Sequence, residues 1–216
     1  MNYTYLIFPE VHLKVRDGHK LRGYFANKFG KDSDLFHNHD TNGKTIYRYP
    51  KIQYKVVKGS PMVIGIEDGA QLIIERFLGI THIEIDGVTI PTDHKNMKSR
   101  EVDIGVESAL HTYKFLNPWL ALNSKNYQKF QRVDVKEQKS MLESILIRNM
   151  QSFFSSLRYR EKQRMMVSLD LREVPVNFKN ESMSGFKGKF TTNVLLPDFI
   201  GLGKSVSRGF GTIQRQ

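Results

Sequence analysis

One order of predicted elements occurs twice along this chain, and it limits the possible folds more than any other feature. In the first half, alternating or β-branched runs predict strands, and apolar residues at helical spacing predict helices. The predicted elements are a strand at 3–8, a helix at 17–29, strands at 52–57 and 62–66, a helix at 67–78 and a strand region at 82–90 that turns at Asp86-Gly87. This is the order of a ferredoxin-like domain, the scaffold that RNA-recognition modules also use.

The second half repeats the pattern, although not the residue identities. Its predicted elements are a strand region at 101–116, helices at 117–133 and 135–157, strands at 165–171 and 189–196, one short helical turn at 197–200 and a closing strand at 212–213. We therefore predict an α+β fold of two tandem ferredoxin-like (RRM-like, βαββαβ) domains, 1–92 and 100–216. The polar, charged segment at 91–100 is the predicted junction between them.

The charge of the chain indicates an anionic partner. Its 216 residues include 33 lysines and arginines against 22 aspartates and glutamates, a net charge of +11. From Arg158 onward there are 11 cationic and 5 acidic side chains, so an excess of 6 lies in the last quarter. Such a concentration is the electrostatic footprint of a nucleic-acid-binding protein.

Several classes of protein are excluded by what the sequence lacks. It contains no cysteine, which rules out disulfides and thiolate metal sites. No apolar run approaches the ~20 residues that cross a membrane. The first residues lack the basic and long apolar regions of a signal peptide. We therefore expect a soluble, cytoplasmic protein.

A glycine-rich stretch at 197–211 is the strongest candidate for a binding site. Glycines permit positive φ angles, and consecutive amide N–H groups in such a loop can form a concave anion site. Its lysine and arginine add charge-assisted donors that suit phosphate oxygens. The candidate RNA-binding residues are Gly201, Gly203, Lys204, Ser205, Ser207, Arg208, Gly209 and Gly211.

Two other interpretations of this stretch are possible. The sequence Gly203-Lys204-Ser205 resembles the end of a Walker A loop, but Asp198 stands where that motif needs a glycine and no helical run follows. The stretch could also be a plain glycine-rich turn before the last strand. The density of serine, lysine and arginine among the glycines favours the anion site.

A polar loop in the first half carries the candidate catalytic residues. His37 and His39 are two positions apart, so in an extended backbone both imidazoles face the same side. Imidazoles titrate near neutral pH and suit general acid/base catalysis, and the hydroxyl of the nearby Tyr47 can support them. A solvated loop that happens to hold two histidines is the structural alternative. A two-histidine metal site completed by Asp34 or Asp40 is another.

These residues together resemble a known family. The stretch from Gly201 to Gly211 is similar to the C-terminal glycine-rich loop of the CRISPR-associated repeat-RNA endoribonucleases. Residues 20–25, the histidine loop and residues 49–55 resemble the N-terminal half of the same family, in its b-subtype. The resemblance implies metal-independent cleavage of CRISPR repeat RNA, without a cofactor. In that reaction a ribose 2′-hydroxyl attacks the neighbouring phosphate and leaves a 2′,3′-cyclic phosphate.

The resemblance also implies roles for individual residues and partners. His39 is the first choice for the acid/base group and His37 the second, with Tyr47 in support. The implied partner is CRISPR repeat RNA; further subunits of a CRISPR effector complex and a second copy of the chain are additional candidates. The alternative function is a non-catalytic subunit that holds CRISPR RNA without cutting it. The sequence leaves open which repeat is recognised, where it is cut, and which histidine is the base.

Overall fold

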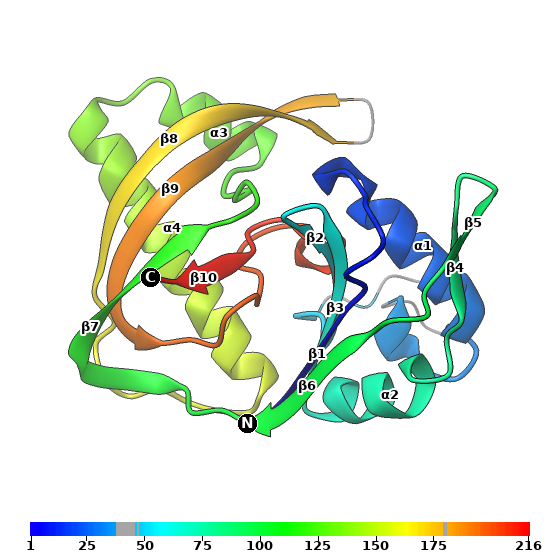
Figure 1. Ribbon diagram of the computed structural model, residues 1–216. Coiled ribbons are helices and arrows are strands. Elements are labelled where there is room, and N and C mark those ends of the chain that lie inside the picture. The colour runs from blue at the N-terminus through cyan, green and yellow to red at the C-terminus, as the bar shows by residue number, and fades with distance from the viewer. Residues whose placement is uncertain (38–45, 47, 179–180) are drawn as a thin grey trace. The chain divides into compact units, whose positions relative to one another are not determined.

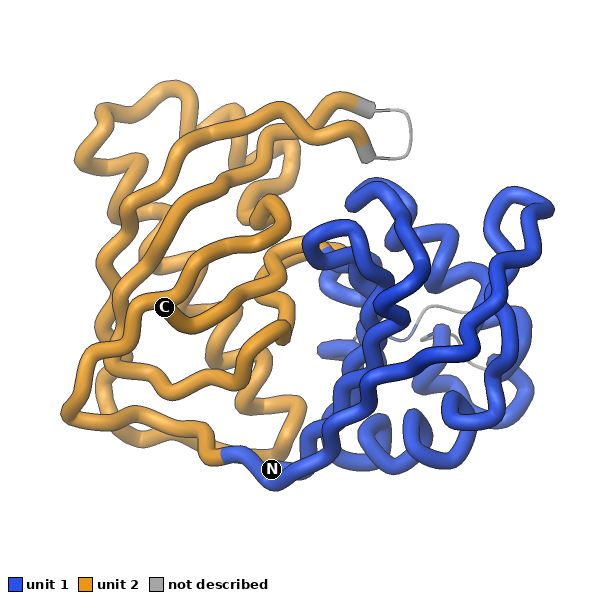
Figure 2. The backbone as a smooth tube through the Cα atoms, in the orientation of Figure 1, with its two compact units in different colours: residues 1–102, 206–209 blue, residues 103–205, 210–216 orange. Residues whose placement is uncertain are grey.

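The computed structural model describes residues 1–37, 46, 48–178 and 181–216. Its contacts divide the chain into two compact units, which Figure 2 colours separately. Unit 1 comprises residues 1–102 together with the short segment 206–209 from the glycine-rich stretch, and unit 2 comprises residues 103–205 and 210–216. No helix in the described part of the chain is long and apolar enough to span a membrane.

Unit 1 is built on a four-stranded antiparallel sheet with the order β2-β3-β1-β6 (Figure 1). Its strands and helices are β1 Asn2–Ile7, α1 Gly18–Phe29, β2 Ile52–Val57, β3 Ser60–Ile66, α2 Asp68–Phe77, β4 His82–Ile85, β5 Val88–Pro91 and β6 Asn96–Glu101. Single 3-10 turns occur at η1 Val15–Asp17 and η2 Asp34–Phe36. The order of the sheet is that of a ferredoxin-like domain, which confirms the predicted fold class.

The fourth strand of this sheet is not the predicted one. The segment predicted as that strand forms the separate hairpin of β4 and β5. The fourth strand is β6, which pairs with β1 from Asn2↔Glu101 to Ile7↔Asn96. The interpretation of 91–100 as a linker is therefore wrong. A charged edge strand with most of its side chains exposed has no alternating apolar pattern, so it resembles a linker in sequence.

Apolar side chains from α1 and α2 pack against one face of the sheet. Phe25 of α1 lies at the centre of this core, with its ring centroid 4.6 Å from that of Phe77 and 5.8 Å from that of Tyr54. Leu21 lies one turn before Phe25 and is also buried, so the two residues fix which side of α1 faces the sheet. This orientation also determines where the polar residues of α1 lie.

Unit 2 contains a second four-stranded antiparallel sheet with the order β10-β7-β9-β8. Its elements are β7 Gly105–Phe115, α3 Ser124–Phe130, α4 Val135–Ser156, β8 Val167–Phe178, β9 Glu181–Leu195 and β10 Ile213–Arg215. The topology repeats that of unit 1, as predicted. Strands β8 and β9 pair from Val167↔Thr192 to Phe178↔Glu181, well beyond the two short strands that the apolar pattern predicted.

Two helical predictions in unit 2 differ from the structure. The helix predicted from residue 117 begins only at Ser124, because the preceding residues form an irregular buried segment in which Trp119 bridges to Phe186 of β9. The short helical turn predicted at 197–200 is absent from this segment, where Phe199 has a φ of 66°. A helical turn does occur slightly later, at η3 Val206–Arg208.

Candidate nucleic-acid interface

Backbone pairing closes the glycine-rich stretch into a loop. Gly201 bridges to Thr212, and the Leu202 amide donates to the carbonyl oxygen of Gly211 at 3.0 Å. Gly211 has a φ of 62°, and a Cβ atom at this position would lie 1.9 Å from the Leu202 carbonyl oxygen. Only glycine fits there, so these residues shape the base of the loop.

The loop also packs closely on the core of unit 2. Gly203 has a φ of 93°, and a Cβ atom on it would lie 2.6 Å from Nε1 of Trp119. That indole nitrogen donates to Asn149 Oδ1 of α4 at 3.0 Å, so the ring is held in place. Lys204 donates its amide N–H to the Leu120 carbonyl oxygen at 3.1 Å, while its side chain is exposed. Partial burial lowers the pKa of its amine below the ordinary value.

The tip of the loop belongs to unit 1, where η3 packs against β2 and the start of α1. Two glycines permit this close approach. Gly209, with a φ of 91°, would place a Cβ atom 3.1 Å from the Tyr54 carbonyl oxygen, and Gly18 would place one 2.6 Å from the Arg208 carbonyl oxygen. Ser205 precedes the tip with a φ of 55°, and Ser207 lies within η3 and is half-buried.

Two arginines from distant parts of the sequence lie on neighbouring elements of unit 1. Arg22 of α1 and Arg208 of η3 are both half-buried. Burial lowers the pKa of the Arg22 guanidinium, and the like charge of Arg208 lowers it further. Burial also lowers the pKa of Arg208. Two neighbouring, partly desolvated positive charges are stabilised by a bound anion, and guanidinium groups suit phosphate.

Arg22 also connects this pair to the predicted catalytic loop. Its Nη2 atom donates to the carbonyl oxygen of His37 at 2.5 Å. His37 follows the η2 turn, and its imidazole lies 3.5 Å from the position of a Cβ atom on Gly30 at the end of α1. The structure therefore brings His37 and Arg208 to the same helix. His39 and Tyr47 lie outside the described residues.

The sequence did not distinguish Arg22 from the other cations of its helix. Lys20 pairs with Asp17, at 3.2 Å, and with Asp86. Lys51 pairs with Asp68 at 2.7 Å. Their charges are therefore already balanced, whereas the hydrogen-bond partner of Arg22 is a neutral carbonyl oxygen and its pKa is lowered by the like charge of Arg208. No local signal in the sequence could have selected Arg22, because its neighbour Arg208 lies near the other end of the chain.

A buried lysine lies behind the loop tip and was not predicted. Lys55 of β2 is fully buried, and its amine donates to Gln53 Oε1 at 2.8 Å. Gln53 in turn donates to the hydroxyl of Tyr49 at 3.0 Å. Burial lowers the pKa of Lys55 well below its ordinary value. Among the described residues, no group of three or more His, Asp or Glu side chains is placed to hold a metal ion.

Comparisons with known proteins identify the family. The model of the Cas6b N-terminal domain matches residues 1–103, and that of the Cas6b C-terminal domain matches residues 105–216. The chain belongs to the Cas6b family. A crystal structure of Cas6b is 36% identical, with a TM-score of 0.95, and the match covers 100% of this chain and 99% of that one.

The chain is also similar to three further proteins. A crystal structure titled CRISPR RNA processing endoribonuclease Cas6b is 33% identical, with a TM-score of 0.80 and full coverage of both chains. An uncharacterized protein of Methanocaldococcus jannaschii is 32% identical over 142 residues, which are 65% of this chain and 97% of that protein. A type IV Cas6 crRNA endonuclease, Csf5, is 10% identical with a TM-score of 0.63 and shares the fold alone. The boundary between the two Cas6b domain matches, at residues 103–105, lies close to the boundary between units 1 and 2, which follows Val102.

Proposed function

We propose that this chain is a metal-independent endoribonuclease that cleaves CRISPR repeat RNA. Membership of the Cas6b family supports this activity, because one similar structure is named a CRISPR RNA processing endoribonuclease. The observation that carries the proposal is Arg22, which donates to the backbone of His37 and has its pKa lowered by the like charge of Arg208. A phosphate-binding pair of cations beside an acid/base loop has the chemistry that phosphodiester cleavage needs.

The proposed reaction is an internal transfer at phosphorus. A base removes the proton from a ribose 2′-hydroxyl, and the 2′-oxygen forms a bond to the adjacent phosphorus. The bond between phosphorus and the 5′-oxygen breaks, and an acid donates a proton to that oxygen. The products are a 2′,3′-cyclic phosphate and a 5′-hydroxyl. We assign His39 and His37 to the acid/base roles, with Tyr47 in support, and the arginine pair to the charge that develops on the phosphate.

The glycine-rich loop is the proposed binding element for the RNA backbone. Its exposed Lys204 and half-buried Arg208 supply charge, and its closely packed glycines hold the backbone in a fixed shape. CRISPR repeat RNA is therefore the proposed partner. Association with other effector-complex subunits, and with a second copy of the chain, rests on the family resemblance alone.

Incubation of end-labelled repeat RNA with the protein in EDTA tests the proposal. A parallel set of substrates carries a 2′-deoxy substitution at each candidate position. We expect one cut that persists in EDTA and that a single deoxy substitution blocks. Cleavage that is lost in EDTA and returns with Zn²⁺ or Mn²⁺ would overturn the metal-independent mechanism. Tight binding without cleavage would favour the non-catalytic RNA-binding subunit.

A further inference from the structure

A second strongly basic segment lies in unit 2 and contains none of the residues assigned above. It is the connection from α4 to β8, residues 157–166, which we call the α4–β8 connection. Its cations are Arg158, Arg160, Lys162 and Arg164, and its one acidic residue is Glu161. Four positive charges against one negative charge leave this ten-residue segment with an excess of three positive charges.

The one carboxylate of the connection accepts hydrogen bonds from backbone amides. Glu161 accepts hydrogen bonds from the amides of Lys162 and Gln163, both at 2.8 Å, and from the amide of Val106 at 3.0 Å. The Tyr159 hydroxyl also donates to it, at 3.1 Å. These bonds, that from Gln163 above all, lower the pKa of Glu161. The carboxylate thus organises the turn instead of pairing with an arginine.

The connection is fixed to unit 2 at both ends. At its start, the Tyr159 amide donates to the Phe154 carbonyl oxygen at 3.0 Å, which ends α4. At its end, the side chain of Asn193 on β9 donates to the Arg164 carbonyl oxygen at 3.0 Å and accepts from the Met166 amide at 2.7 Å. A segment held in this way presents its side chains with little loss of backbone entropy on binding.

The cations themselves are exposed and available. All four are exposed, and among the described residues none of their side chains makes an ion pair or hydrogen bond. By contrast, Lys20, Lys51 and Arg76 of unit 1 are each matched by an aspartate. Unpaired cations on a fixed scaffold retain their full attraction for an external anion.

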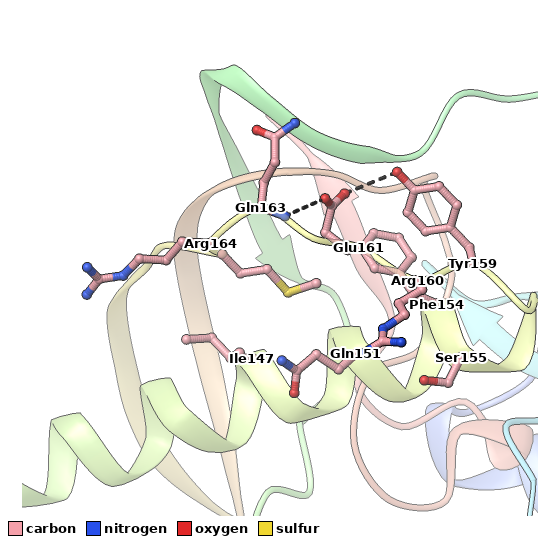
Figure 3. A pocket seen from close by; sticks show the side chains of 10 residues that line it. Ile147, Gln151, Phe154, Ser155, Tyr159, Arg160, Glu161, Gln163 and Arg164 are labelled. Carbon is pink, nitrogen blue, oxygen red and sulfur yellow. Dashed lines mark hydrogen bonds between the residues drawn. The ribbon is translucent and has the colours of Figure 1, made fainter.

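A hollow of about 580 Å³ lies beside the connection, between it and α4 (Figure 3). Gln151 and Ser155 of α4 line one side, and Arg160 extends toward them, while Arg164 points away from the hollow (Figure 3). Tyr159 stands at the rim with 41% of its surface exposed, and its ring meets Phe154 edge-on at 5.2 Å. Amide and hydroxyl groups, an aromatic ring and arginines together suit a nucleotide chain.

We propose that the α4–β8 connection is a second binding site for the RNA backbone, separate from the glycine-rich loop. Three arginines and Lys162 would contact phosphates, and Tyr159 would contact a sugar or base at the hollow. We favour RNA over an acidic protein as the ligand. RNA offers phosphates that can pair with the cations and bases that can stack on the tyrosine ring. This inference rests on the proposed function, since it assumes that the chain handles RNA.

A matched pair of variants tests the second site. The connection variant carries Arg158→Gln, Arg160→Gln and Arg164→Gln. The control variant carries Lys125→Gln, Lys136→Gln and Lys139→Gln, which removes the same charge from exposed positions of α3 and α4. Affinity for repeat RNA with a 2′-deoxy substitution at the cut site is measured over a range of salt concentrations. We expect the connection variant to lose about tenfold or more in affinity, and the negative slope of log K against log salt to decrease in magnitude by about 0.7 for each lost contact with a single strand. The control variant should keep both its affinity and its slope close to wild type.

The outcomes separate this inference from the proposed function. If wild-type protein neither binds nor cuts repeat RNA, the proposed function fails. If wild type binds and cuts but the connection variant has unchanged affinity and slope, the second site alone is refuted. Single-turnover cleavage at saturating RNA should remain at the wild-type rate in the connection variant, because these residues lie outside the acid/base and arginine groups.

Further measurements distinguish loss of the site from misfolding and RNA from an acidic protein as the partner. In wild-type protein, RNA should shield Lys162 from acetylation while the exposed Lys136 stays reactive; equal reactivity of both lysines with RNA bound would contradict the site. The triple Arg→Lys variant keeps the charge and should recover most of the affinity. Binding of polyglutamate to wild type but not to the connection variant, with RNA affinity unchanged, would assign the surface to an acidic protein instead.

Discussion

At the scale of single residues, the candidate site depends on which charges are already balanced. Lys20 and Lys51 have aspartate partners, so their charges are largely neutralised in the folded protein. Burial lowers the pKa of Arg22 and of Arg208, and the like charge of Arg208 lowers that of Arg22 further. Because partly desolvated like charges repel, we expect a phosphate bound between these two arginines to gain more than one bound at the exposed lysine–aspartate pairs.

We expect Arg22→Gln and Arg208→Gln each to weaken binding of repeat RNA, by about 1–3 kcal/mol, since each removes a charge-assisted hydrogen bond to phosphate. The effects should not add in the double variant if both side chains hold one phosphate. Filter binding with an uncleavable deoxy substrate provides the measurement. Lys20→Gln is the matched control on the same helix and should change affinity little; a larger loss there than for Arg22→Gln would contradict the assignment.

The acid/base assignment leads to a separate prediction. His39→Ala should reduce single-turnover cleavage by about 10²–10⁴-fold, the usual contribution of general acid/base catalysis, and leave RNA affinity largely intact. His82→Ala serves as control, because His82 is an exposed histidine of unit 1. Cleavage by His39→Ala at the wild-type rate would transfer the leading role to His37.

At the scale of elements, the shape of the glycine-rich loop depends on backbone conformations and close contacts that side chains would prevent. Gly209 combines a φ of 91° with close contact to the backbone of β2. The packing of η3 on β2 therefore depends on the absence of a side chain at this position. The position of Arg208 follows directly, since it is the preceding residue.

We expect Gly209→Ala to lower the free energy of unfolding by about 1–3 kcal/mol, because a strained φ and a tight contact with the backbone of β2 combine. RNA affinity should fall as well, since η3 must move away from β2. Gly23→Ala provides the control: no atom lies within 4 Å of a Cβ atom at this helical position, and alanine should stabilise α1 by up to about 1 kcal/mol. Urea denaturation and RNA binding of both variants check the prediction. Unchanged RNA affinity in Gly209→Ala would show that the loop tip is not a binding element.

At the scale of the whole molecule, one buried amine affects how stability varies with pH. Folding removes Lys55 from water and leaves it Gln53 as its hydrogen-bond partner, so its pKa in the folded state lies well below that of the unfolded chain. Between these two pKa values the unfolded state binds more protons than the folded state. Stability therefore rises with pH through this window and falls as the pH is lowered.

We expect Lys55→Met to be more stable than wild type at about pH 6, and the advantage to shrink toward about pH 9, because methionine fills similar space without a charge to desolvate. Urea midpoints at both pH values measure this. Lys98→Met, at an exposed position of β6 in the same sheet, is the control and should follow the wild-type pH dependence. Parallel pH curves for Lys55→Met and wild type would mean that Lys55 stays charged in the folded protein.

The sequence by itself determined the order of most elements, the ferredoxin-like class and the positions of the glycine-rich loop and the histidine pair. These features depend on short-range properties, namely periodicity, glycine conformation and charge density, which neighbouring residues carry. Only the tertiary structure decided that β6 completes the first sheet, that Lys55 is buried, and that Arg22 meets Arg208. Such facts depend on which distant segments pack together: an edge strand carries no apolar pattern, and a pair of arginines at opposite ends of the chain leaves no local signal.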